Sequence, residues 1–170
     1  MDGRPPQKGP DGGQMKAARA WALRALARRA RSVHEMRRGL LLKGFPEGVA
    51  ESVIEALLGS GLLDDPSFAA RWVAVRSGSK RLGPLRLAHE LRQRGVPEGI
   101  IRSALAEGLD RETEAGLARQ AAERKIAAVG KSGPRAVAAL LRHLRSRGFS
   151  PDAIRKALAG LGEDPSDGES

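Results

Sequence analysis

Apolar residues recur three or four positions apart over most of this chain, the spacing that places them on one face of an α-helix. Val49, Val53 and Leu57 show it in the first third, and Ile101 and Leu105 show it further on. Ala and Leu supply most of the apolar residues, and both lose little conformational freedom in a helix. With three Phe, two Trp and no Tyr, the chain has too few aromatic residues for a typical β-sandwich or barrel. The pattern predicts an all-α protein.

Three glycines occupy the same place in a recurring pattern. Gly44, Gly95 and Gly148 each follow a leucine, two further residues and a basic residue, and each precedes an apolar residue. A glycine just beyond a helix takes the left-handed conformation without the clash that a Cβ atom causes. In such an ending the side chain four residues before the glycine contacts the one after it. The predicted contacts are Leu40 with Phe45, Leu91 with Val96, and Leu144 with Phe149.

Signals for helix starts surround each of these endings. A new helix is predicted directly after Pro46, after Pro97 and after Ser150, whose hydroxyl suits an N-cap with proline next. Ser32 and Glu35 have the spacing of a capping box. The remaining predicted starts are Pro84, Pro134 and Asp65 as an N-cap before Pro66, and the helices upstream are expected over 16–29, 65–76 and 111–128.

The same group of three helices therefore appears three times. We expect repeats at 16–60, 61–108 and 109–161, between an N-terminal tail at 1–15 and an acidic tail at 162–170, both without fixed structure. Three short helices bury little apolar surface alone, so neighbouring repeats are expected to stack. The fold predicted is an all-α, elongated and curved array of three tandem three-helix repeats, which we expect to be a monomer.

Composition restricts the chemistry of the chain. There are no cysteines, which excludes disulfides, zinc–thiolate sites and thiol nucleophiles. No apolar stretch approaches the roughly 20 residues of a membrane-spanning helix, and the first residues have no apolar core of a signal peptide. We therefore expect a soluble cytoplasmic protein without membrane contact.

Charge is both large and unevenly distributed. The formal net charge is +10, and because the N-terminal tail is neutral and the C-terminal tail acidic, the helical body is more basic still. Residues 16–43 hold nine basic residues against Glu35 alone, whereas residues 44–70 hold acidic residues and no base. A body this basic is expected to attract nucleic acid or an acidic protein groove. The bland alternative is that these side chains only solvate helix faces.

The first and second helices of each repeat supply the candidate binding surface. It comprises Arg24, Arg28, Arg29, Arg37, Arg38, Lys43, Lys80, Arg81, Arg86, Arg92, Arg94, Arg135, Arg142 and Arg145. Gly44, Gly95 and Gly148 are expected to be structural.

Three-helix units also suggest a helix-turn-helix regulator, in which the last helix enters the major groove of DNA. In the first repeat that helix offers Glu47, Glu51 and Glu55, which would face phosphates. Sequence-specific recognition is therefore disfavoured and stays the alternative.

Patterns that suggest catalysis or cofactors do not hold. Gly130-Lys131-Ser132 resembles the end of a phosphate-binding loop, but Lys125 stands where the first glycine is required. The histidines lie at different offsets from the capping glycines, so stacking would not bring them together: His34, His89 and His143. Trp21, Phe68 and Trp72 are better interpreted as core residues than as base-stacking platforms. We expect no catalytic residue, no metal, no cofactor and no enzymatic activity.

Three segments of the chain carry further residues in a distinctive pattern. The first is Ala22-Leu23, Leu26-Ala27-Arg28-Arg29, Ser32, Glu35-Met36 and Lys43-Gly44-Phe45. The second is Gly61-Leu62-Leu63-Asp64-Asp65, Phe68-Ala69, Trp72-Val73 and Arg76. The third is Leu82-Gly83, Arg86-Leu87, Glu90-Leu91 and Arg94-Gly95-Val96, with a looser likeness from Leu144 to Ala157. Together these segments resemble the RecX family of bacterial recombinase regulators. Met36 stands where leucine is usual in that family, and Trp72 where a smaller aromatic residue is common.

The resemblance covers about residues 16–160 and implies a function in DNA repair, homologous recombination and the SOS response. It implies three tandem three-helix repeats without catalysis. The partners implied are the RecA filament, in whose groove such proteins bind, and single- and double-stranded DNA without sequence preference. The expected effect is suppression of RecA ATP hydrolysis, strand exchange and co-protease activity.

Overall fold

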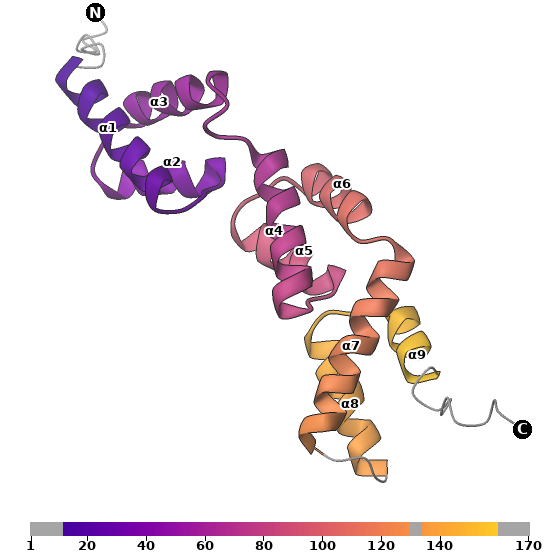
Figure 1. The fold of residues 1–170 in the computed structure, drawn as a ribbon. Helices are drawn as coiled ribbons and strands as arrows, with labels where there is room; N and C mark the ends of the chain where they lie inside the picture. The colour runs from indigo at the N-terminus through magenta and orange to yellow at the C-terminus, as the bar shows by residue number, and fades with distance from the viewer. Residues whose placement is uncertain (1–11, 130–133, 160–170) are drawn as a thin grey trace, which may run out of the picture. The chain divides into compact units, whose positions relative to one another are not determined.

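A computed structural model describes residues 12–129 and 134–159, except the side chains of Val129, Pro134 and Arg135 (Figure 1). Throughout these ranges the regular structure is α-helix, in three groups of three helices. The helices are α1 Gly12–Arg28, α2 Val33–Leu42, α3 Glu47–Gly59, α4 Asp65–Lys80, α5 Pro84–Gln93, α6 Glu98–Gly108, α7 Arg111–Val129, α8 Pro134–Ser146 and α9 Pro151–Ala159. The all-α fold and its three tandem three-helix repeats are confirmed.

The described residues form two compact units. The first contains residues 12–68 and 94–96, and the second contains residues 69–93, 97–129 and 134–159. The expected repeat boundaries and the curvature of the array stay predictions. The Gly130-Lys131-Ser132 segment and most of both tails lie outside the described residues.

The first unit buries one face of each of its three helices. Ala18 and Ala22 of α1, Met36 of α2 and Val53 and Leu57 of α3 are almost completely buried. The small alanine side chains allow α1 to approach α3 closely. Helix α1 begins at Gly12, four residues before the predicted start, because Met15 extends its apolar face and packs against this core.

In the second unit α7 packs against both α8 and α9 (Figure 1). Its buried face is again made of alanines, among them Ala118 and Ala122, facing Leu144 of α8 and Ile154 of α9. In α5 and α6, fully buried leucine and isoleucine side chains continue the 3.6-residue pattern of the sequence.

The glycine caps are confirmed. Gly44, Gly95 and Gly148 have φ angles of 83°, 72° and 81°. The Phe45 N–H donates to the Leu40 carbonyl at 3.3 Å, and the Phe149 N–H repeats this bond to a leucine carbonyl at 3.3 Å. These are the hydrogen bonds of a Schellman ending. They join Leu40 to Phe45 and Leu144 to Phe149, and Gly95 shares the left-handed conformation of the other two glycines.

A fourth ending of this kind was missed in the sequence. Gly61 has φ of 68°, its N–H donates to the Leu58 carbonyl at 2.9 Å, and the Leu62 N–H donates to the Leu57 carbonyl at 2.9 Å. The residue before this glycine is Ser60 rather than a base, so the repeat pattern did not reveal it.

Most predicted helix starts are confirmed, with one correction. The Ser32 hydroxyl accepts a hydrogen bond from the Glu35 N–H at 3.1 Å, as a capping residue should. Asp64, not Asp65, caps α4, since its carboxylate accepts from the Ser67 N–H at 2.9 Å. The Asp65 carboxylate is buried and accepts from the Val33 N–H at 2.9 Å. Asp65 therefore secures the start of α2, a long-range contact that local spacing does not encode.

Two capping turns dock onto the start of the second helix of the preceding repeat. In the first unit the Ser32 hydroxyl donates to the Arg94 carbonyl at 2.5 Å, and Gly95 lies directly against the His34 side chain. In the second unit the Gly83 N–H donates to the Arg147 carbonyl at 2.9 Å. Polar groups at the start of one helix thus pair with backbone carbonyls at the end of another, which have no partner within their own helix.

The second of these contacts, called the Gly83–Gly148 joint below, consists mainly of backbone. The Leu85 N–H donates to the Gly148 carbonyl at 3.0 Å, and Gly148 lies against the backbone of Arg86. A Cβ atom on Gly83 would collide with the Gly148 carbonyl. The joint therefore requires glycine on both sides and fixes the end of α8 beside the α4–α5 link.

Candidate functional site

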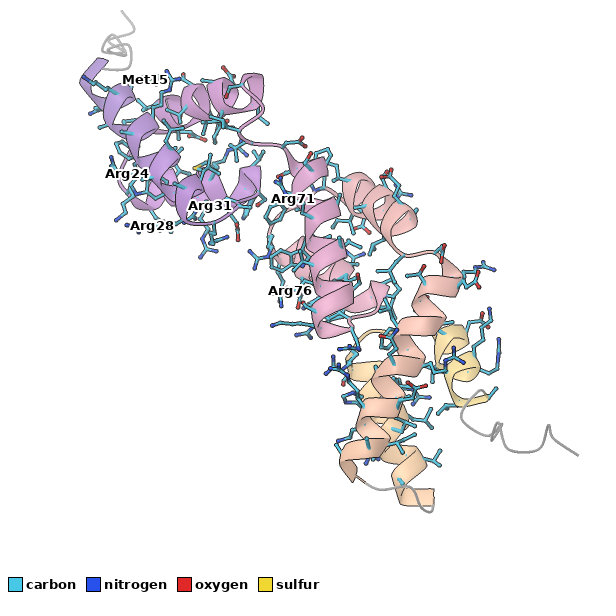
Figure 2. The ribbon with its side chains drawn as sticks, viewed as in Figure 1. Met15, Arg24, Arg28, Arg31, Arg71 and Arg76 are labelled. Atoms are coloured by element: carbon cyan, nitrogen blue, oxygen red, sulfur yellow. The ribbon has the colours of Figure 1, made fainter. Side chains whose placement is uncertain are left out.

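The predicted basic residues of the first repeat divide into free and paired side chains. Figure 2 labels Arg24 and Arg28 on α1 and Arg31 in the turn that follows. Arg24, Arg28, Arg38 and Lys43 are exposed, and no described acidic side chain forms an ion pair with any of them. These four are available to a partner.

Glu35 holds two of the predicted arginines. Its carboxylate lies 2.7 Å from Arg29 Nη1 and 2.5 Å from Arg94 Nη1. Because both guanidinium groups share one largely buried carboxylate, Arg29 and Arg94 have mainly a structural role and are less available to a partner.

Two further arginines form two-bond pairs with glutamates. Arg37 donates to both carboxylate oxygens of Glu51 at 2.5 and 2.7 Å, which raises the arginine pKa and lowers that of Glu51. Arg92 donates to Glu98 at 2.8 and 2.7 Å, and this hydrogen bond lowers the Glu98 pKa. Part of the acidic surface of α3 and α6 is therefore neutralised by the helix before it.

A cleft of about 850 Å³ in the second unit gathers basic side chains from α4, α5, α7, α8 and the α4–α5 link. The predicted residues Lys80, Arg81 and Arg86 line it. Four cations that the site prediction left out line it as well: Arg76, Arg124, Lys125 and Arg147. Among the described residues, Glu90 is the one acid in its lining.

The Gly83–Gly148 joint positions this cleft. Arg147 reaches across it and donates through Nη1 to the Lys80 carbonyl. The same guanidinium donates through Nε to His143 Nε2 at 3.1 Å. Burial, with Arg147 and Lys125 nearby, lowers the His143 pKa and favours the neutral ring that can accept this bond. The cationic end of α8 is thereby held at the rim where α4 ends.

Glu90 is occupied within the cleft. It accepts from the Trp72 indole N–H at 3.0 Å and lies 3.6 Å from Arg76 Nε and 3.8 Å from Arg86 Nε. The Arg76 guanidinium lies 4.4 Å from the centroid of the Trp72 ring (Arg76 is labelled on α4 in Figure 2). One hydrogen bond and two ion pairs leave this carboxylate little capacity to compensate the other cations.

The aromatic side chains are mostly structural. Phe68 is buried, and Trp21 packs against the core of the first unit over Gly39, as predicted. Trp72 departs from the prediction, because it is half-exposed and binds Glu90 and Arg76. Over the described ranges, no three potential ligands gather as a metal site would require. None of the described helices has both the length and the apolar character needed to cross a membrane.

The structure describes the side chains of two of the three basic residues predicted in the third repeat. Arg142 and Arg145 are exposed on α8, whereas the side chain of Arg135 is outside what the structure describes. Arg147 was missed although it precedes Gly148 as Lys43 precedes Gly44, so the repeat pattern itself pointed to it. Arg124 and Lys125 were missed because α7 also carries acidic residues, and only its packing beside α8 shows that these two face the cleft.

Family models match all three repeats. The model described as RecX, first three-helix domain, matches residues 18–57; the second-domain model matches 64–105, and the third-domain model matches 112–158. The second and third of these ranges contain all seven cleft cations.

Relatives and solved structures agree with these matches. The regulatory protein RecX of Halorhodospira halophila is 39% identical over 90% of this chain and 93% of its own. That of Mycobacterium ulcerans is 35% identical over 86% of this chain and 85% of its own. A crystal structure of RecX from Lactobacillus salivarius covers 89% of this chain and 99% of its own with a TM-score of 0.82, at 20% identity, and so shows the fold. A crystal structure titled regulatory protein RecX covers 86% of this chain and 73% of its own, with a TM-score of 0.79 at 25% identity. The chain belongs to the RecX family.

Proposed function

We propose that this protein binds the RecA–DNA filament and inhibits RecA ATP hydrolysis, strand exchange and co-protease activity. Its relatives are named as regulatory proteins. The observation that carries the proposal is the cleft in which seven cationic side chains face one acid that is already hydrogen-bonded. Such a concentration of positive charge attracts the phosphates of DNA.

The protein acts in this proposal by binding alone, as a cytoplasmic monomer in DNA repair, homologous recombination and the SOS response. Its surface toward the filament comprises the exposed cations of the first repeat and the cleft of the second unit. Several of these cations are exposed to solvent, and exposed cations contribute little to stability, so they can be altered without unfolding the protein: Arg28, Arg38, Lys80 and Arg124.

Titration of the protein into a DNA-stimulated RecA ATP hydrolysis assay tests the proposal. Reversing Arg28 and Arg38 to glutamate, or Lys80 and Arg124, should weaken inhibition several-fold, and reversing all four should nearly abolish it. Several weak contacts along one extended partner reinforce each other through effective concentration. The matched control reverses Arg111 and Arg119, two exposed residues of α7 outside the cleft, with the same change of charge.

The experiment distinguishes an error in the assigned binding surface from an error in the proposed function. Inhibition by the four-residue variant equal to that of the parent would contradict the assigned surface. Failure of the parent protein to alter RecA ATP hydrolysis at any concentration would contradict the function itself.

A helix-turn-helix DNA regulator independent of RecA is the alternative. Exposed Glu47 and Glu55 on α3, beside the Arg37–Glu51 pair, argue against insertion of this helix into a DNA groove. Binding to unrelated duplexes should therefore be of similar strength. A preference of about a thousandfold for one sequence, the range of specific DNA-binding proteins, would favour the regulator.

A further inference from the structure

The cleft of the second unit differs in kind from the exposed basic helix faces. It is an open concave space of about 850 Å³. Because its lining comes from the α4–α5 link and from α7 and α8, its cations converge on one space from several directions. On a convex helix face the same charges would diverge into solvent.

Four of its cations have no acidic partner among the described residues: Lys80, Arg81, Arg124 and Lys125. Arg76 and Arg86 share Glu90, and Arg147 is hydrogen-bonded to the Lys80 carbonyl and to His143. Repulsion between uncompensated cations in a partly enclosed space is costly, and an anion in the cleft relieves it.

Arg81 adds an unused hydrogen-bond donor. Its Nε atom is buried and has no hydrogen-bond partner in the described structure. Its backbone has φ of 48°, the left-handed region, and among the described non-glycine residues it alone has a positive φ. A buried unpaired donor and a strained backbone are both unfavourable, and they are typical of binding sites whose ligand supplies the missing acceptor.

We propose that this cleft binds a run of adjacent phosphates, from a single nucleic-acid strand or from a short inorganic polyphosphate. Tetrahedral phosphates offer several acceptor oxygens each, which suits converging lysine and arginine donors. A duplex is stiff over so short a length, whereas a single strand can bend into a concave surface, so a single strand is the nucleic acid proposed. The link to RecA rests on the proposed function, whereas the anion site does not.

Binding of two probes to the full chain alone tests the site. Inorganic tripolyphosphate is measured by titration calorimetry, and a fluorescent twelve-residue oligothymidylate by anisotropy. Reversing Arg124 and Lys125 to glutamate should weaken binding of tripolyphosphate about tenfold or more, since each lost phosphate contact costs affinity. The control, reversal of Arg111 and Arg119 on the same helix, should change it less than about threefold if the converging geometry matters more than net charge.

Each outcome decides something. Loss of both probes in the cleft variant, with the control intact, assigns the site to a single strand. Loss of tripolyphosphate alone assigns it to free polyphosphate. Equal weakening by the two variants, or no saturable tripolyphosphate binding to the parent, would overturn the proposal.

Arg81 provides a second, independent variant. Arg81→Gly removes both the left-handed strain and the guanidinium, so the melting temperature should rise while tripolyphosphate affinity falls several-fold. Arg81→Lys keeps the charge but not the Nε donor, and should also weaken binding. Affinity equal to that of the parent in both variants would contradict the assignment. None of these measurements contains RecA, so their failure is distinguishable from failure of the proposed function.

Discussion

At the scale of single residues, Gly44 and Gly148 share a backbone conformation but not a neighbourhood. Their φ angles are 83° and 81°. A Cβ atom on Gly44 would meet nothing within 4 Å, whereas one on Gly148 would collide with the backbone of Arg86. Gly44 is thus required by its own turn alone, and Gly148 also by the close approach of a second helix.

Alanine at the two positions separates these requirements. Gly44→Ala should cost about 1 kcal/mol of unfolding free energy, the usual penalty for a side chain in the left-handed region. Gly148→Ala should cost about 3 kcal/mol or more, in the range of overpacked sites, because the Arg86 backbone cannot move aside without breaking the joint. Urea denaturation followed by circular dichroism measures both. Equal losses of unfolding free energy in the two variants would mean that the Gly83–Gly148 joint can shift to make room for a Cβ atom.

Asp65 is the residue whose charge state should alter stability most visibly. Burial raises its pKa above the ordinary value of 3.8, and the neighbouring Asp64 and Glu35 add to the rise. The folded protein therefore retains this proton to higher pH than the unfolded chain does. Protonated Asp65 therefore contributes to the free energy of unfolding in full below pH 3.8. This contribution is lost as the pH rises through the pKa that Asp65 has in the folded protein.

Substitution of Asp65 tests this sign. Asp65→Asn keeps an acceptor for the Val33 N–H but cannot ionise, so it should gain stability relative to the parent as pH increases from about 4 to 7. Asp65→Ala leaves that buried N–H unpaired and should lose about 1–3 kcal/mol. Denaturation of both variants at several pH values measures the differences. If the Asp65→Asn variant became less stable relative to the parent as pH rises, the raised pKa of Asp65 would be contradicted.

At the scale of helices, the second helix of a repeat carries bases and the third carries acids that partly neutralise them. The Arg37–Glu51 pair joins α2 to α3, and both side chains are partly exposed to solvent. Such pairs add little stability, so this one chiefly determines how much positive charge α2 presents.

Releasing this pair should therefore change binding more than folding. Glu51→Gln should alter the unfolding free energy by less than about 1 kcal/mol, as exposed ion pairs do. It frees the Arg37 guanidinium and should strengthen both oligonucleotide binding and inhibition of RecA. Thermal unfolding and anisotropy measure the two effects, with Ser52→Ala on the same helix as a neutral control. Unchanged binding would show that this part of α2 faces away from the partner.

Local sequence predicted the helices well and the contacts between them poorly. Glycine caps and apolar spacing depend on neighbours within one turn, so the ends marked by Gly44, Gly95 and Gly148 were found. The bond from Val33 to Asp65 joins residues 32 positions apart, and nothing in their spacing indicates it. Arg124 lines the cleft because of how α7 packs, and the distribution of charge along the sequence does not predict that packing.

At the scale of the whole molecule, a net charge of +10 predicts strongly salt-dependent binding to nucleic acid. Neutralising several phosphates releases their counterions, so affinity should fall at least about tenfold between 50 and 200 mM salt. The cleft variant, with Arg124 and Lys125 reversed, should show a shallower slope than the parent because fewer phosphates are neutralised. Anisotropy over a salt series measures it. A parent affinity independent of salt would contradict phosphate contacts as the source of binding.

The Gly83–Gly148 joint has a consequence for how such a chain can diverge. Two of its hydrogen bonds join N–H and carbonyl groups of the main chain, which every amino acid except proline can provide. Mutations can therefore replace the surrounding side chains, and with them the pattern of charge, while the repeats stay in register. The crystal structure of RecX from Lactobacillus salivarius shares the fold at 20% identity. Two glycines thus leave the surface free to adapt to a changing partner.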